Sequence, residues 1–253
     1  MKSRFREKLD KGQPVIGSFV KITDPAVVEI MGLAGLDFAI IDMEHGPISF
    51  ETAQNSIRSA ELVGISPIIR VSENDPVAIL RSLDIGAEGV EVPQIRNAKD
   101  AQITASSARF HPQGDRGVCR YVRSGRYSSM DRKEYFRTAN EKVITIGHLE
   151  GIEAVKNLDE IMAVDGLDIL FIGPYDLSQS VGVPGEVDNP LVIKQMEQII
   201  ESAKKANKLI GTFADDITSA KRWIDAGVMY IAVSVDVGIF YNACREIATS
   251  LMK

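Results

Sequence analysis

Residues 35–47, GLDFAIIDMEHGP, join a glycine, an apolar run and a cluster of ionisable groups. The run over residues 37–43 is apolar on both faces, which is typical of a buried parallel strand rather than a half-exposed antiparallel one. It ends in Asp42, Glu44 and His45. Ionisable groups that leave water need partners. The stretch therefore predicts a buried strand that ends in either a paired surface feature or a working site.

Runs of the same apolar, Ile-, Val- and Phe-rich type recur along the chain. They occupy residues 14–20, 66–71, 89–95, 143–149, 168–173, 209–214 and 230–235. Segments with helical spacing lie between them. Helix starts are indicated by an acid or amide before proline, at Asp24-Pro25, Asp75-Pro76 and Asn189-Pro190. Helix ends are indicated by Gly35, Gly64, Gly86 and Gly227.

Eight strand–helix alternations in 253 residues predict one α/β domain over residues 1–253, folded as a single (β/α)8 TIM barrel. An open doubly wound sheet is the alternative, but no Gly-rich phosphate loop follows the first strand. Residues 110–142 interrupt the alternation as an inserted segment. Its arginines stand at positions 116, 120, 123, 126, 132 and 137. Such a segment could form a basic patch for an acidic ligand, although a salt-bridged subunit contact is favoured.

Composition excludes several function classes. The chain is 45% hydrophobic and 25% charged with a net charge of −6, so binding to a nucleic-acid backbone has no electrostatic support. The two cysteines show no metal-site spacing, and a disulfide framework is not expected. No apolar stretch reaches the length of a membrane span, and the first residues lack the apolar core of a signal peptide. These features predict a soluble cytoplasmic protein with no membrane partner.

Charged residues gather at the predicted strand ends, which share one rim in a parallel barrel. Glu150 and Asp176 follow neighbouring strands, and His148 lies at the end of the same strand as Glu150. His45 and Arg70 lie at two other strand ends. Two carboxylates with room for water suit Mg²⁺ or Mn²⁺ better than a structural Zn²⁺. Either acid could instead cap the helix that follows its strand. The combination with His45 and Arg70 favours the metal site.

Several motifs, taken in order, carry a resemblance to a known family. They are GSFVKITDPAVVEIMGLAGLDFAIIDMEHGP, IIRVSENDPVAILRSLDIGAEGVEVPQI, HPQGDRG, HLEGIEAVKNLDEI and IGPYDLSQSVG. This chain resembles, over nearly its whole length, the 4-hydroxy-2-oxoheptanedioate aldolases, which are metal-dependent class II aldolases of pyruvate and include the 2-keto-3-deoxy sugar-acid aldolases. DMEHGP and GPYDLS are specific when they occur together in this order.

The resemblance implies a role for each matched residue. His45 matches the general base, Arg70 the residue that stabilises the developing enolate, and Asp84 the acid that orients the histidine. Glu150 and Asp176 match the two metal-binding carboxylates. The segment that receives the pyruvate carboxylate is matched by Gly173, Tyr175 and Asp176.

Two residues depart from the family pattern. His148 stands where the family usually has glutamine, and an imidazole offers fewer hydrogen bonds than an amide. It could still donate to a bound oxo acid. Tyr175 stands where a smaller residue is frequent, which could narrow the pocket.

The expected activity is reversible cleavage of a 4-hydroxy-2-oxo acid to pyruvate and an aldehyde. Cleavage leaves an electron pair on the carbon beside a keto group, and a divalent cation can stabilise that charge as a Lewis acid. Mg²⁺ or Mn²⁺ is the expected ion, with Co²⁺ as a further possibility, and no organic cofactor is expected. Alternatives are a decarboxylase or lyase that uses the same site, and a non-catalytic metabolite-binding barrel. A Schiff-base aldolase is disfavoured because only Lys21 lies near a strand end.

The resemblance also implies a homo-oligomer, a hexamer or trimer, with exchanged C-terminal helices.

Overall fold

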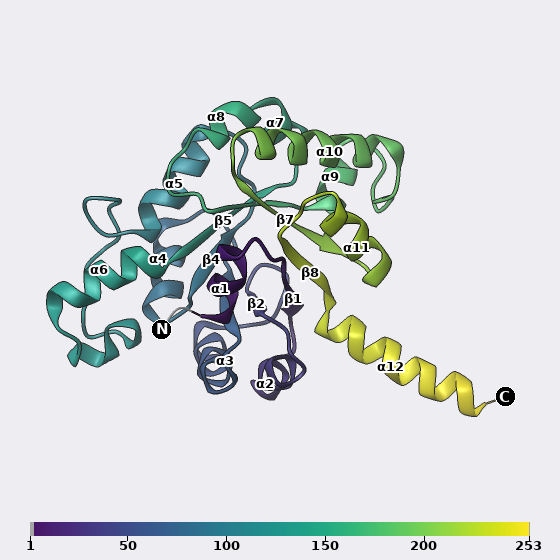
Figure 1. The fold of residues 1–253 in the computed structure, drawn as a ribbon. Helices are drawn as coiled ribbons and strands as arrows, with labels where there is room; N and C mark the ends of the chain where they lie inside the picture. Colours follow the sequence, from purple (N-terminus) through teal and green to yellow (C-terminus); the bar gives the residue numbers. More distant parts are fainter. Residues whose placement is uncertain (1–2, 253) are drawn as a thin grey trace.

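The computed structural model describes residues 3–252 and shows a closed barrel of eight parallel strands in chain order (Figure 1). The strands are β1 (Val15–Val20), β2 (Phe38–Asp42), β3 (Ser66–Arg70), β4 (Gly89–Val92), β5 (Ile144–Leu149), β6 (Ile169–Ile172), β7 (Leu209–Ala214) and β8 (Tyr230–Val235). Pairing of β1 with β8 closes the barrel. The predicted (β/α)8 barrel is confirmed, and each predicted strand is present.

Helices surround the barrel and connect its strands. They are α1 (Arg4–Asp10), α2 (Ala26–Leu33), α3 (Phe50–Val63), α4 (Pro76–Asp84), α5 (Ala98–Ala108), α6 (Arg132–Lys142), α7 (Ile152–Lys156), α8 (Leu158–Met162), α9 (Pro174–Ser180), α10 (Pro190–Lys205), α11 (Ile217–Asp225) and α12 (Asp236–Leu251). None of the helices within residues 3–252 is both long and apolar enough to cross a membrane.

The predicted helix starts are close to those observed. Asp75 caps α4 by accepting from the amide of Ala78 at 2.9 Å, and Asn189 caps α10 in the same way. Helix α2 begins one residue later than expected, because Pro25 occupies its cap position. Asp24 still accepts from the amide of Ala26 at 2.9 Å. Short polar side chains thus satisfy amides that have no partner inside the helix.

The interior of the barrel is packed with large side chains. Phe38 and Tyr230 stack with ring centroids 4.0 Å apart, and Phe5 of α1 packs edge-on against both rings. A second and larger apolar cluster lies between the strands and the outer helices. Burial of each such side chain contributes about 1.5–3 kcal/mol. The interior is therefore a core, which leaves the ends of the strands for a site.

The arginine-rich segment forms a short 3₁₀ helix, η1 (Arg123–Ser128), followed by α6. Three of its arginines make ion pairs within the chain, among them Arg137, which lies 2.8 Å from Glu141 in α6. Arg116 lies 2.6 Å from Asp84, and Arg123 lies 2.5 Å from Glu61. These ion pairs lie inside one chain, whereas the prediction was a salt-bridged contact between subunits. The segment's role in a subunit contact stays a prediction.

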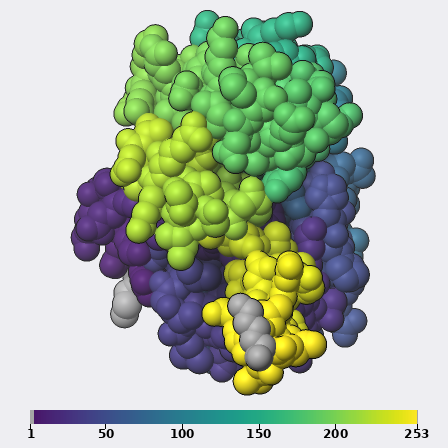
Figure 2. All heavy atoms as spheres, turned by 90° about the vertical axis from the view of Figure 1, so that its right-hand side faces the viewer, coloured from purple at the N-terminus to yellow at the C-terminus, as the bar shows by residue number. Residues whose placement is uncertain are grey.

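Helix α12 extends away from the barrel (Figure 1), and it is the yellow segment facing the viewer in Figure 2. Only Asp236, at its first position, is buried. The carboxylate of Asp236 accepts from the amides of Lys21 and Ile22, which ties the start of α12 to the end of β1. The large exposed apolar side chains on the rest of the helix are Val237, Ile239, Phe240, Tyr241, Ile247 and Leu251.

Candidate active site

The carboxyl ends of the strands surround a cavity of about 560 Å³. Its lining includes seven predicted residues: His45, Arg70, His148, Glu150, Gly173, Tyr175 and Asp176. A second cavity of about 420 Å³ opens beside it. His45, Glu150 and Asp176 line both cavities and therefore form their shared wall. Parallel strands bring these residues together although they are far apart in the sequence.

Arg70 and Asp42 form a buried pair beneath this cavity. The guanidinium donates from Nε to Oδ1 at 2.9 Å and from Nη2 to Oδ2 at 2.7 Å. Asp42 has no exposed surface. Burial alone would raise the pKa of Asp42, but the hydrogen bonds and charge of Arg70 lower it overall. Asp42 therefore supports the site from beneath, because its carboxylate fixes the orientation of the guanidinium.

Asp42 also shapes the turn that presents His45. Its Oδ1 accepts from the amides of Glu44 and His45, each at 3.1 Å. His45 itself is open to the cavities, with 58% of its side chain exposed. A base that takes a proton from a substrate must reach that substrate. The position of His45 meets this requirement.

The charge of Glu44, next to these residues, is only partly compensated. Its Oε2 lies 3.2 Å from Nη1 of Arg70. Within residues 3–252, this buried oxygen nevertheless receives no hydrogen bond. Burial raises the pKa of Glu44, the charge of Arg70 offsets part of this, and the charge of Glu150 raises it further. The rim therefore holds more negative charge than its own cations neutralise.

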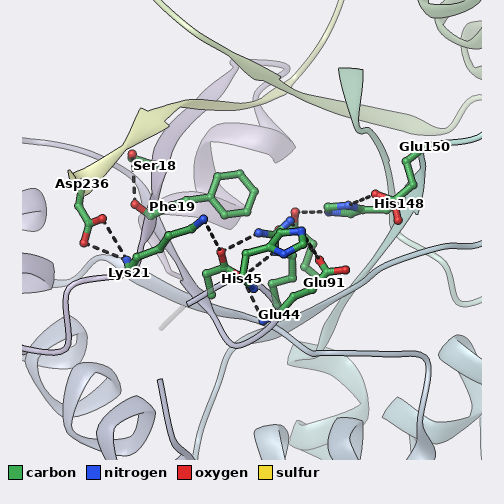
Figure 3. A network of polar contacts seen from close by, with 11 residues as sticks. Ser18, Phe19, Lys21, Glu44, His45, Glu91, His148, Glu150 and Asp236 are labelled. Atoms are coloured by element: carbon green, nitrogen blue, oxygen red, sulfur yellow. Dashed lines mark hydrogen bonds and ion pairs between the residues drawn. The ribbon is translucent and has the colours of Figure 1, made fainter. Parts of the chain in front are cut away.

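His148 lies between two carboxylates, as Figure 3 shows. Its Nε2 is 2.5 Å from Glu91 and its Nδ1 is 3.2 Å from Glu150. The ring stacks on Phe171 with centroids 4.5 Å apart. Burial would lower the pKa of His148, but the charge of Glu91 and the hydrogen bond to Glu150 raise it to about 9. His148 is therefore a cation at neutral pH that holds Glu150 in place.

This imidazolium predicts a pH dependence of stability. A histidine whose pKa rises from 6.5 to about 9 on folding stabilises the protein fully below pH 6.5, and that stability is lost as pH rises towards 9. We expect a loss of the order of 3 kcal/mol in the free energy of unfolding over this interval. Urea unfolding at several pH values would measure it. His148→Gln should remove the slope, whereas His111→Gln, at an exposed site, should keep it. Equal slopes in all three proteins would contradict the assignment.

Glu150 and Asp176 have the properties expected of a cation site. Burial raises the pKa of Asp176, and the charge of Glu150 raises it further, so the two carboxylates repel each other. Within residues 3–252, no hydrogen bond or ion pair satisfies the Asp176 carboxylate. Burial would also raise the pKa of Glu150, but the hydrogen bond from His148 lowers it overall. Ionised, mutually repelling carboxylates fit a divalent ion that completes its coordination with substrate oxygens and water.

Gly173 makes room for this pair. A Cβ atom at Gly173 would lie 3.0 Å from Cβ and 3.1 Å from Oε2 of Glu150. Any side chain there would push Glu150 away from the end of β6. The described residues contain no cluster of three or more His, Cys, Asp or Glu side chains able to hold a metal. An ion at Glu150 and Asp176 would therefore depend on non-protein ligands.

Asp84 is not brought to His45 within the chain. It ends α4, which runs back to the amino ends of the strands, whereas His45 follows β2 at the carboxyl ends. Its carboxylate is 2.6 Å from Arg116. Burial raises the pKa of Asp84, and Arg116 offsets part of this. One copy of the chain cannot provide the predicted Asp84–His45 contact, so the orienting role of Asp84 stays a prediction that would need a second copy.

Sequence reasoning missed Glu91, a central member of the polar network. Glu91 is fully buried, and it accepts from Tyr230 at 3.1 Å as well as contacting His148. A charged residue between Val90 and Val92 in an apolar run was the available signal. Asp215 was also missed; it accepts from the hydroxyl of Tyr175 at 2.7 Å. No periodicity indicated that contact.

Comparison with known proteins identifies relatives over the full barrel. The family model described as HpcH/HpaI aldolase/citrate lyase matches residues 15–243. A 4-hydroxy-2-oxo-heptane-1,7-dioate aldolase of Klebsiella pneumoniae is 32% identical, over 98% of this chain and 93% of the relative. A 5-keto-4-deoxy-D-glucarate aldolase of an Enterobacter species is also 32% identical, over 99% of this chain and 97% of the relative.

Solved structures show the same architecture. A HpcH/HpaI aldolase/citrate lyase family protein from Burkholderia cenocepacia superposes with a TM-score of 0.93 at 30% identity, and 98% of each chain is covered. The citrate synthase SbnG superposes with a TM-score of 0.88, also at 30% identity, over 99% of this chain and 98% of SbnG. The chain is therefore similar both to aldolases and to a citrate synthase.

Proposed function

Because the chain belongs to the HpcH/HpaI aldolase/citrate lyase family, we propose that its rim residues perform class II pyruvate aldolase chemistry. The protein is a carbon–carbon lyase of the aldolase type. The proposed substrate is a 4-hydroxy-2-oxo acid, cleaved reversibly to pyruvate and an aldehyde. The observation that carries the proposal is the shared wall of His45, Glu150 and Asp176 beside Arg70.

We assign the cation site to Glu150 and Asp176, with Mg²⁺ or Mn²⁺ as the expected ion. Their mutual repulsion and the unsatisfied Oε2 of Glu44 support this assignment. A bound divalent ion supplies Lewis acidity, which draws electron density from the 2-oxo group of the substrate. The positively charged His148 keeps the carboxylate of Glu150 in a fixed orientation while leaving lone pairs on both oxygens.

The chain's own residues carry the proton and the developing charge. His45 removes the proton from the C4 hydroxyl, the C3–C4 bond breaks, and the aldehyde leaves. The electron pair moves towards the 2-oxo group, where the guanidinium of Arg70 stabilises the negative charge. Protonated His45 then returns the proton to C3, which gives pyruvate. Proton balance is complete, because the hydroxyl hydrogen ends on the methyl group.

Replacement of His45 tests this proton transfer. Positioned general bases contribute about 10²–10⁴-fold, so we expect His45→Ala to lower the rate of pyruvate release at least about a hundredfold. Release is measured with Mg²⁺ or Mn²⁺ present and lactate dehydrogenase as the coupling enzyme. His111→Ala is the matched control and should retain activity. If no 4-hydroxy-2-oxo acid yields pyruvate and His45→Ala changes nothing, the proposed function is wrong.

Two related activities use the same site. Decarboxylation of a 2-oxo diacid leaves the same electron pair and would show as carbon dioxide release without an aldehyde. The relation to SbnG favours bond formation with another acceptor as a second candidate. A Schiff-base route through Lys21 predicts trapping by borohydride and resistance to EDTA. The proposed route predicts the opposite result in both tests.

We also propose that the protein forms a homo-oligomer through α12. The helix exposes six large apolar side chains at positions 237, 239, 240, 241, 247 and 251. Exposed apolar patches of this kind mark contact surfaces. Oligomerisation would also provide the second copy that an Asp84–His45 contact requires. Sedimentation analysis would show a hexamer or trimer if this proposal is correct.

A further inference from the structure

The 560 Å³ cavity contains polar groups that the proton-transfer steps do not use. Tyr175, Asp215 and Lys21 line it together with Arg70, Glu150 and Asp176. Tyr175 comes from the start of α9, and Asp215 follows β7. A site of this size exceeds the needs of pyruvate alone. Groups beyond the reacting atoms are therefore available to bind the part of the substrate that leaves as the aldehyde.

Tyr175 and Asp215 present acceptors rather than donors to the cavity. The Tyr175 hydroxyl donates its hydrogen to Asp215 at 2.7 Å. Its oxygen keeps lone pairs, and the second oxygen of Asp215 is also an acceptor. Burial and the hydrogen bond to Asp215 raise the pKa of Tyr175 to about 12, so this hydrogen stays in place at neutral pH. A matching ligand must bring hydrogen-bond donors.

Aromatic rings set the position of this pair and line the rest of the wall. The ring of Tyr175 packs edge-on against that of Phe213, with ring centroids 5.9 Å apart. The ring centroids of Phe213 and Phe19 are 6.0 Å apart. Phe171 completes the apolar lining. The cavity thus combines an apolar surface for a carbon chain with a local pair of acceptors. This combination suits a chain that carries hydroxyl groups.

We infer that Tyr175 and Asp215 form a specificity determinant that selects hydroxylated aldehyde fragments, so that the substrate is a polyhydroxylated 2-oxo acid of the sugar-acid type. The inference rests on the proposed aldolase function. Hydroxyl groups can donate to both acceptors, whereas a ligand carboxylate has no hydrogen to donate and is repelled by Asp215. Both side chains are partly open to water, with Tyr175 46% exposed, so discrimination against the analogue that lacks a hydroxyl group should be about tenfold.

Lys21 is the group that could favour a carboxylate instead. Its Nζ lies 3.6 Å from Asp42, which Arg70 and two backbone amides already satisfy. The ammonium therefore keeps free hydrogen atoms at the cavity. For this reason an acidic aldehyde belongs in the test, together with the variant Lys21→Met.

The test compares the kcat/KM values for addition of pyruvate to D-glyceraldehyde, propanal and succinic semialdehyde with Mn²⁺ present. Wild type should prefer D-glyceraldehyde. Tyr175→Phe and Asp215→Ala should each lower the glyceraldehyde-to-propanal ratio about tenfold. Glu153→Gln, which neutralises an exposed acid of the neighbouring cavity, should leave the ratio unchanged. The inference is overturned if both aldehydes lose activity equally in the Tyr175 and Asp215 variants. It is also overturned if wild type prefers succinic semialdehyde and Lys21→Met abolishes that preference.

Deuterium exchange into the methyl group of pyruvate separates this inference from the proposed function. This exchange requires the base to remove a methyl proton and the site to stabilise the resulting negative charge, but it does not require an aldehyde. If wild type exchanges deuterium without preferring the hydroxylated aldehyde, only the specificity inference fails. If wild type with Mn²⁺ shows no exchange and no addition, the aldolase function fails and the specificity inference is overturned with it.

Discussion

Replacing Asp176 with asparagine should lower the rate of pyruvate release about a thousandfold or more, because several kcal/mol of charge stabilisation depend on the cation that it helps to hold. The free energy of unfolding of the metal-free protein should stay the same or increase in this variant. Burial and the charge of Glu150 raise the pKa of Asp176, so its ionised form destabilises the metal-free fold at neutral pH. In EDTA, Asp176→Asn should therefore unfold at the same or a higher urea concentration than wild type.

Glu153→Gln is the matched control for this loss of charge. Glu153 is exposed and lines the second cavity beside Glu150, but it has no proposed role. This variant should keep both activity and Mn²⁺ binding, whereas Asp176→Asn should lose Mn²⁺ binding in a titration followed by electron paramagnetic resonance. Retention of Mn²⁺ affinity and of activity within tenfold by Asp176→Asn would refute the assigned cation site.

Asp176→Asn is expected to lower activity without lowering stability because the rim carries excess negative charge. The charge of Glu150 raises the pKa of both Glu44 and Asp176, and the charges of Arg70 and His148 offset only part of this effect. Like charges in a partly buried site are costly. A divalent ion at the proposed site would relieve this cost, so the carboxylates that destabilise the fold without the ion are the ones expected to hold it. Ion binding should accordingly raise the urea concentration at which wild type unfolds.

The barrel could be predicted from sequence because its signals are local. Buried parallel strands appear as short apolar runs, and Asp75-Pro76 and Asn189-Pro190 mark helix starts through contacts within three residues. Residues that follow strands, such as Glu150 and Asp176, could be grouped at one rim because topology alone fixes which end of a strand they occupy. Periodicity and topology are sufficient for these predictions.

Contacts that depend on side-chain direction could not be predicted in this way. Glu91 lies within a strand rather than at its end, and its burial against His148 and Tyr230 depends on which face of β4 points inward. Asp84 was assigned by resemblance alone, and a match of motifs does not say whether two residues meet within one chain. The chain's own topology places Asp84 and His45 at opposite ends of the barrel.

Arg70→Met should impair both catalysis and folding, for different reasons. Loss of one group that stabilises developing negative charge costs about 10²–10³-fold in kcat, so pyruvate release should fall by up to about a thousandfold. The same change leaves Asp42 buried without its principal partner, which should lower the free energy of unfolding by about 3–5 kcal/mol. Urea unfolding and the coupled assay measure the two effects separately.

The double variant Arg70→Met/Asp42→Asn distinguishes the two roles. Asparagine keeps an oxygen that can accept from the amides of Glu44 and His45, but it removes the charge that Arg70 neutralises. Most of the lost stability should therefore return, while activity should stay about as low as in Arg70→Met. Recovery of activity to within tenfold of wild type would show that Arg70 only supports the fold. If stability does not recover, the unpaired charge of Asp42 is not the main cause of the loss.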